Sequence, residues 1–340
     1  MIAAAKRVAA VAALFGVLAA GPVLAAPFKL VISDLTTPLV PNSVMDLAKS
    51  LGYFEREGVD VELVRVQQTP SAVAALQSGE GDMANIAVDA AVQLVARKQI
   101  AMKAVTSPNK SLPYLIAAKD ALAKVADLNG HSFGVGRIGS LDHSLSVNVL
   151  TRLGADPGKV DFVSLGQPNV RAQALAAGQI DATTVSIGVW LSLPDKKGLH
   201  VLVNADDYYA AAPVVNKVNV VTDTVLKEKR DQVTAVTRAL VKISRDFAAN
   251  PQKWVDAMAM ARSDVAKADL VTLADSFKQS WSINGGMSKD ELAYTGDWLY
   301  ATPDFKDVPK VPLSDWVDFS IMDAILAKDG TAPGFDRPGR

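Results

Sequence analysis

Two segments of this chain repeat one pattern about 100 residues apart. The stretch ALQSGEGDMA at 75–84 shares Ala, Leu, Gly and Asp, in register, with ALAAGQIDAT at 174–183. Upstream of each copy, a Leu-Gly pair precedes a β-rich run. This spacing is too long for a solenoid repeat and is typical of two similar domains. Helices that end at Gly, followed by short β-rich runs, predict an α/β fold in which each domain is a sheet flanked by helices.

The coarse element pattern predicts that the second domain is inserted into the first. β-rich runs are followed by helical spacing in both halves, whereas residues 223–301 have the period of consecutive helices without new strands. We therefore expect a two-domain periplasmic-binding-protein-like architecture in which two crossings, near Leu115 and Val215, permit hinge closure over a ligand cleft. The expected ranges are 28–115 and 220–335 for domain I and 116–219 for domain II. The expected strands are 28–32, 59–66, 83–87, 112–118, 131–135 and 214–222.

The N-terminal segment predicts export. Lys6 and Arg7 precede an apolar run of about 13 residues and a small-residue cleavage signal, which is typical of a secretory signal peptide at 1–25. The run is shorter than the roughly 20 residues that a membrane-spanning helix needs. An uncleaved N-terminal anchor is the alternative. We expect the mature protein in the periplasm, as a monomer.

The amino-acid composition excludes several kinds of site and makes several kinds of partner less favourable. The chain contains no Cys, which excludes disulfides, thiolate metal sites and Cys nucleophiles. Without Lys6 and Arg7, the formal net charge of −1 becomes about −3, which does not favour nucleic acid or a membrane surface as the main partner. The three His residues do not have metal-ligand spacing, and the common hydrolase and phosphate-loop motifs are absent. We expect no cofactor and no catalytic activity.

The stretch GVGRIG at 134–139 matches the glycine pattern of dinucleotide-binding enzymes. In those enzymes an acidic residue ends the second strand, whereas Asp161 stands at the start of the corresponding β-rich run. We interpret the glycines as a tight turn that presents a helix N-terminus to an oxyanion, with Ser140 and Arg137 as contacts. In the alternative interpretation Ser140 only caps the helix, Arg137 faces solvent and Asp142 satisfies the helix dipole.

Other candidate binding residues come from the carboxyl ends of the predicted strands, where ligands of open α/β sheets gather. Trp190 could stack on an aromatic solute, and His143, one turn into a helix, could donate a hydrogen bond, although a capping role is the simpler interpretation. The candidate ligand-binding residues are Thr36, Thr37, Pro38, Gln68, Asn85, Arg137, Ser140, His143, Thr184, Ser186 and Trp190.

Three motifs carry a resemblance to a known family. The segment LGYFEREGVDVEL at 51–63, the Leu-x-x-Gly-x-x-Asp motif at 76–82 and the Gly139-Ser140 pair resemble the NitT/TauT (nitrate, sulfonate and taurine, NMT1/THI5-like) solute-binding proteins of ABC transporters. The resemblance implies a type II two-domain periplasmic receptor that closes on a small solute and delivers it to an ABC permease at the inner membrane.

We expect the solute to be a small organic anion, a sulfonate or carboxylate, with an aromatic body as one variant. Three alternatives remain: a receptor for a neutral pyrimidine-like solute, an enzyme of the thiamine-pyrimidine-precursor type on the same scaffold, and a sensor that signals to a membrane partner. The absence of Cys counts against the enzyme, since the related synthases depend on a cysteine-rich motif.

Overall fold

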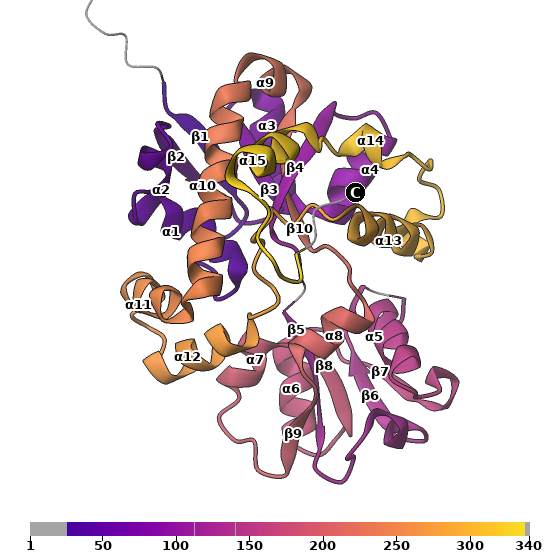
Figure 1. The fold of residues 1–340 in the computed structure, drawn as a ribbon. Coiled ribbons are helices and arrows are strands. Elements are labelled where there is room, and N and C mark those ends of the chain that lie inside the picture. The colour runs from indigo at the N-terminus through magenta and orange to yellow at the C-terminus, as the bar shows by residue number, and fades with distance from the viewer. Residues whose placement is uncertain (1–25, 112, 140, 337–340) are drawn as a thin grey trace, which may run out of the picture.

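A computed structural model describes residues 26–111, 113–139 and 141–336 of the chain (Figure 1). The predicted signal peptide at 1–25 and the candidate Ser140 lie outside the described residues. Within the described part, no helix combines the length and the apolar character that a membrane span requires.

The first sheet has five strands in the order β2-β1-β3-β10-β4. β1 pairs in parallel with β2 and β3, whereas β10 is antiparallel to both of its neighbours. The strands are β1 (Phe28–Ile32), β2 (Val61–Arg65), β3 (Met83–Ala87), β4 (Met102–Asn109) and β10 (Lys217–Thr222). The connecting helices are η1 (Pro41–Ser43), α1 (Val44–Ser50), α2 (Tyr53–Arg56), α3 (Thr69–Ser78) and α4 (Val88–Ala96). We call this sheet and its helices lobe I.

The second sheet repeats the plan in the order β7-β6-β8-β5-β9, with β6 parallel to β7 and β8 and with β5 antiparallel to its neighbours. The strands are β5 (Tyr114–Lys119), β6 (Ser132–Val135), β7 (Asp161–Ser164), β8 (Ala182–Ser186) and β9 (Leu199–Val203). The helices are η2 (Val125–Leu128), α5 (Leu141–Arg152), η3 (Pro157–Lys159), α6 (Pro168–Ala176), α7 (Ile187–Ser192) and α8 (Ala205–Ala211). We call this part lobe II.

The chain passes between the lobes twice, once between β4 and β5 and once between α8 and β10. The two sheets, each flanked by helices, confirm the predicted α/β fold class of the periplasmic binding proteins (Figure 1). We call the described residues 110, 111 and 113 the first crossing and residues 212–216 the second crossing.

The repeated Asp has the same structural role in both lobes. Asp82 Oδ2 accepts a hydrogen bond from the Lys29 amide at 2.9 Å, and Asp181 Oδ2 accepts one from the Ser132 amide at 3.0 Å. Each carboxylate thereby holds the start of the first parallel strand of its sheet. The repeat that is visible in the sequence therefore records a strand-anchoring contact.

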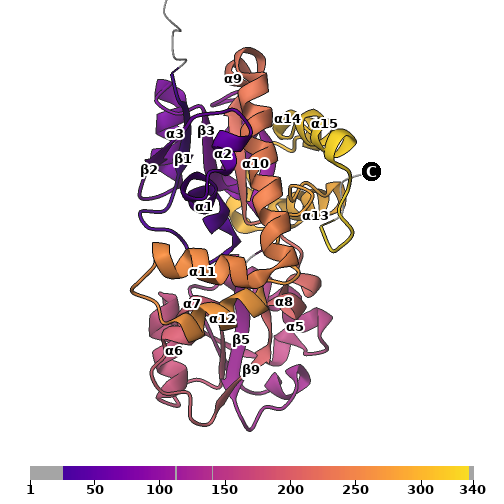
Figure 2. The same cartoon turned by 60° about the vertical axis from the view of Figure 1, so that its left-hand side comes forward.

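After β10, helices make up most of the described chain, as the sequence predicts. α10 (Arg230–Ala249) buries its predicted stripe of Val233, Val236, Leu240 and Ile243 and packs against α1, α2 and β4. α11 and α12 lie between lobe I and the α7 and α8 side of lobe II (Figure 2). The remaining elements are α9 (Asp223–Glu228), α11 (Pro251–Ala261), α12 (Lys267–Ser276), α13 (Lys289–Tyr300), η4 (Pro303–Phe305), α14 (Leu313–Trp316) and α15 (Ser320–Asp329).

The lowered pKa of the Asp181 carboxyl makes the stability of lobe II depend on pH. Burial opposes ionisation, but the Lys119 ammonium and the Ser132 amide and hydroxyl outweigh it and hold the pKa of this carboxyl well below its usual range. The lowered pKa stabilises the fold above the unfolded pKa of about 4, and this contribution is lost as the pH falls through the folded pKa.

We therefore expect Asp181→Asn to lower the free energy of unfolding by about 1–3 kcal/mol at pH 7. The difference from the parent should shrink as the pH falls below about 4. Urea unfolding at several pH values measures it. Asp161→Asn, at an exposed position of β7, is the control. An equal loss at pH 7 and pH 3 would contradict the assignment.

Candidate functional site

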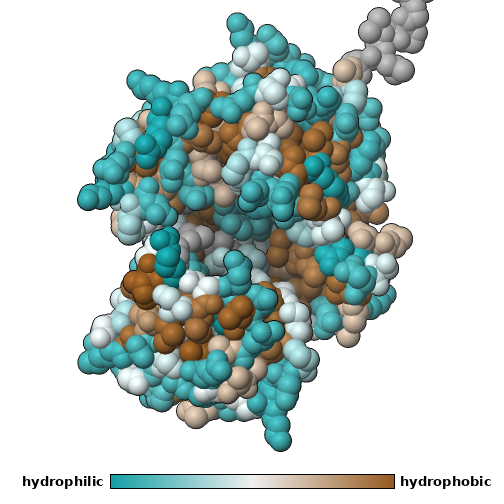
Figure 3. Space-filling model, turned by 180° about the vertical axis from the view of Figure 1, so that it is seen from behind, coloured by the Kyte–Doolittle hydropathy of each residue, from teal (hydrophilic) through white to brown (hydrophobic). Residues whose placement is uncertain are grey.

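The carboxyl ends of the parallel strands in both lobes lie on the sides that face each other. In lobe I, β4 ends and β10 begins at the edge where both crossings leave the sheet, and β1 and β3 end at this edge. In lobe II, β5 begins with Tyr114 next to Ser186, the last residue of β8. The surface is hollowed between the lobes (Figure 3). This cleft is where an open α/β fold places a ligand, and we take it as the candidate site.

Buried amides form the base of the lobe I wall. Asn42 Nδ2 donates to Asn85 Oδ1 at 2.9 Å, and Asn85 Nδ2 donates to Asn219 Oδ1 at 2.8 Å. The Ser33 hydroxyl donates to the Asn85 carbonyl at 2.9 Å. The predicted residue Asn85 is therefore at the centre of the wall, but it is fully buried and its side chain is used within the protein. Asn85 therefore holds neighbouring residues of the wall in place through its hydrogen bonds to Asn42 and Asn219.

Lys217, the first residue of β10, brings a cation to this wall. Its ammonium donates to Ser33 Oγ and to Asp34 Oδ2, both at 3.1 Å. An ammonium has three donors, so one remains beyond these two bonds. The side chain is 20% exposed, and its salt-bridge partner Asp34 is also partly exposed. The Lys217 ammonium can therefore donate to a further oxygen atom.

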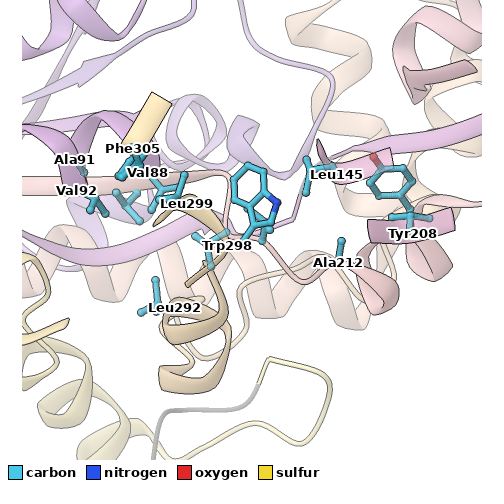
Figure 4. Packing of buried hydrophobic residues seen from close by; sticks show 14 of the residues in the cluster. Val88, Ala91, Val92, Leu145, Tyr208, Ala212, Leu292, Trp298, Leu299 and Phe305 are labelled. Atoms are coloured by element: carbon cyan, nitrogen blue, oxygen red, sulfur yellow. The ribbon is translucent and has the colours of Figure 1, made fainter. Parts of the chain in front are cut away.

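A small, partly open cavity of about 50 Å³ lies between the start of α4, the second crossing and α13. It is too small for a whole ligand of the usual size. Trp298 lines it and is 8% exposed. In Figure 4 the indole lies between Val88 of lobe I and Leu299 of α13 on one side and Leu145 and Tyr208 of lobe II on the other, all members of one apolar cluster. The cavity lining is Ala87, Val88, Asp89, Val214, Val215, Asn216, Trp298 and Leu299.

A buried ion pair forms the lobe II wall. Asp142 Oδ2 accepts from the Gly136 amide at 2.7 Å and lies 3.2 Å from Arg171 Nη2. Arg171 also donates to the carbonyl oxygens of Gly166 at 2.5 Å and Thr184 at 3.0 Å. Asp142 therefore already accepts a hydrogen bond from the backbone of the turn before α5. This agrees with the alternative interpretation of the sequence, in which Asp142 satisfies the start of the helix. The Thr184 hydroxyl lies 2.8 Å from Ser146 Oγ, so this predicted residue is also used within the wall.

The glycine turn has the local structure that the sequence predicts. A Cβ on Gly134 would lie 2.6 Å from Ile180 Cδ1, so a larger residue in this strand would require Ile180 to move. Gly139 has φ +82°, which favours glycine in the turn. Arg137, which lies between these two glycines, is exposed.

Two of the remaining predicted residues, His143 and Ser186, make capping contacts within lobe II. His143 Nδ1 accepts from the Gly139 amide at 3.1 Å and its ring packs edge-on against Phe162, so it caps the turn. Burial lowers the pKa of His143 despite the nearby Asp142. Ser186 caps α7 through the Val189 amide.

The other five predicted residues are exposed, half-buried or packed within the protein. Trp190 is in the buried apolar cluster, with the Lys196 ammonium over its ring. Thr37 is buried and its carbonyl accepts from Arg262. Thr36 and Gln68 are exposed, and Pro38 is half-buried. Thr36, Gln68 and Pro38 can contact a solute only if it extends to the loops on which they lie.

Sequence reasoning missed Lys217, Arg171 and Trp298. Lys217 occurs in an alternating β-rich run and Trp298 in an amphipathic helix, where each is typical of an ordinary surface or core position. Because Lys217 begins a strand at the sheet edge that holds both crossings, the topology was the missing signal. Among the described residues, no group of three or more His, Asp or Glu side chains is placed to bind a metal ion.

The chain matches the model of one protein family over residues 44–254, which is more than half of its length. The description of that family is NMT1/THI5 like. The chain belongs to the NMT1/THI5-like family. A comparison with curated protein sequences finds no match.

Solved structures share the fold at low identity. A putative periplasmic sulfonate-binding protein, SsuA, from Methylobacillus flagellatus has a TM-score of 0.70 and 14% identity, covering 89% of this chain and 94% of that one. The ligand-binding component of an ABC-type import system from Staphylococcus aureus has a TM-score of 0.62 and 18% identity, covering 87% and 97%. A Candida albicans gene product with the generic periplasmic binding protein fold has a TM-score of 0.54 and 14% identity, covering 91% and 96%.

Proposed function

We propose that this NMT1/THI5-like protein is the solute-binding component of an ABC importer that works in the periplasm. Two lobes with facing strand ends, joined by two crossings, form a clamp that closes on a small solute and reopens to release it. The fold shared with the ABC import component supports this role. A permease then takes the solute from the closed form. In this role the solute leaves the protein chemically unchanged.

The solute that the site suits best is a small organic carboxylate or sulfonate with an apolar body. The observation that carries this choice is the partly exposed ammonium of Lys217, which makes two hydrogen bonds at the start of β10, next in sequence to Asn216 of the cavity that Trp298 lines. An oxyanion accepts a charge-assisted hydrogen bond from the ammonium. The apolar body packs on the indole, and the exposed Arg137 on the opposite loop supplies a second cation. The sulfonate named for the SsuA relative supports the same class.

A neutral or zwitterionic solute is the second candidate, because the cations of the walls have carboxylate partners. Asp34 lies 3.1 Å from Lys217, and Asp142 lies 3.2 Å from Arg171. Such pairs present a donor and an acceptor side by side, which suits the edge of an aminopyrimidine or an amide. An anion gains less from a cation that is already neutralised.

A thermal-shift panel separates the two candidates. Acetate, benzoate, methanesulfonate, benzenesulfonate, nitrate and cytosine are added to the mature protein, because a ligand of the native state raises its melting temperature. We expect benzoate or benzenesulfonate to give the largest rise and Lys217→Met to remove it. Lys227→Met, on α9 away from the cleft, is the matched control. A rise with cytosine alone would contradict the anion proposal, and chemical change of a bound compound on incubation would contradict the transport role.

A further inference from the structure

One face of α13 contacts both crossings and the cleft. Glu291, Thr295 and Trp298 follow one another at intervals of four and three residues, which places them on the same side of the helix. All three side chains are buried or nearly so. The face on which they lie is therefore directed at the junction of the two lobes.

Glu291 binds the first crossing. Lys110, the residue after β4, is fully buried, and its ammonium lies 3.5 Å from Glu291 Oε1. The same ammonium lies 4.8 Å from the ring centroid of Tyr209, which is on α8, the helix that precedes the second crossing. A buried ammonium is stable only with such partners. Lys110 therefore joins α13, the first crossing and lobe II at one point.

Thr295 binds the second crossing. Its hydroxyl accepts a hydrogen bond from the Val215 amide at 2.9 Å and donates to the Glu291 carbonyl at 2.7 Å. The bond to Val215 is buried, and Val215 also lines the cavity beside Trp298. Any rotation of the second crossing must break this bond or carry α13 with it.

Two further contacts join the same helix to lobe II. The Arg152 guanidinium of α5 lies 5.7 Å from the ring centroid of Tyr294. The Trp298 indole lies on the side of Leu145 of α5, with Tyr208 of α8 beyond it (Figure 4), and all three belong to one apolar cluster. α13 thus contacts both crossings and lobe II.

We propose that α13 couples the solute site to the hinge: Trp298 contacts the solute, and Glu291 and Thr295 are positioning residues that fix its helix to the two crossings. The solute contact rests on the proposed function, whereas the coupling of α13 to lobe orientation does not. A solute that packs on Trp298 acts on a helix that holds both crossings, so its binding energy shifts the equilibrium between lobe orientations.

The orientation of the lobes can be measured without any solute. The chain has no Cys, so Leu35→Cys and Ile138→Cys give a specific spin-label pair on the loops that follow β1 and β6. These side chains are 61% and 53% exposed. Double electron–electron resonance then reports the distance distribution between the two lips of the cleft. Glu291→Gln and Thr295→Val are compared with Asp297→Asn, an exposed position on the same helix.

We expect Asp297→Asn to keep the distance distribution of the labelled parent, and Glu291→Gln and Thr295→Val each to broaden it or shift its maximum. Parent-like distributions in both variants, with melting curves that show them folded, would overturn the coupling whether or not a solute binds. Trp298→Leu should weaken binding of the tightest panel compound roughly tenfold. Unchanged affinity in Trp298→Leu would remove Trp298 from the solute site while leaving the importer role intact.

Discussion

Replacing Arg171 with methionine is expected to lower the free energy of unfolding by about 3–5 kcal/mol, the usual cost of removing one partner of a buried ion pair. Arg171 is 5% exposed on its side chain and is bound to the Asp142 carboxylate and to the carbonyl oxygens of Gly166 and Thr184. Methionine fills much of the volume but leaves a buried carboxylate and two carbonyl oxygens without this donor. Urea unfolding of the purified mature protein measures the loss.

Two variants identify the cause of that loss. Arg97→Met makes the same chemical change at an exposed position after α4 and should alter stability by less than about 0.5 kcal/mol. The double variant Arg171→Met with Asp142→Leu removes both charges and should recover part of the loss, because an apolar pair can replace a buried ion pair. A single variant no less stable than Arg97→Met would contradict the central place of Arg171 in the lobe II wall.

Trp298→Ala is expected to lower the free energy of unfolding by about 3–5 kcal/mol, the cost of removing a large buried aromatic. The indole lies between the apolar residues of the two lobes (Figure 4), so its loss leaves a cavity that both lobes would have to close. Phe335→Ala, at a side chain that is 61% exposed, is the control and should change stability by less than about 0.5 kcal/mol. Equal effects of the two substitutions would contradict the role of Trp298 in joining the lobes.

The fold could be predicted from the sequence because its signals are local and occur twice. The run at 28–32 coincides with β1, the run at 83–87 coincides with β3, and the apolar stripe around Val236 is the buried side of α10. The Asp82 and Asp181 positions recur because each sheet needs the same anchor at its first parallel strand. Local patterns of this kind require no knowledge of distant contacts.

The candidate site depends on contacts between distant segments, so little of it could be predicted. Lys217 meets Asp34 across 183 residues, and the Val215 amide meets Thr295 across 80. No period or spacing in the sequence encodes such pairs. Strand-end reasoning predicted Asn85 and Thr184 as ligand-binding residues; both lie at the walls of the candidate site, with side chains that bond within the walls. His143 illustrates the reverse case, since its capping role was the simpler interpretation and is the one observed.

The central claim is that a small solute binds between the lobes, with its polar group at Lys217 and its body at Trp298. A crystal structure of the mature protein with the panel compound that raises the melting temperature most tests it directly. The account predicts the compound in the cleft, with an oxygen within hydrogen-bond distance of Lys217 Nζ and its apolar part against the Trp298 indole. A compound bound instead in a groove outside the cleft, such as the one between α2 and α10, would contradict it.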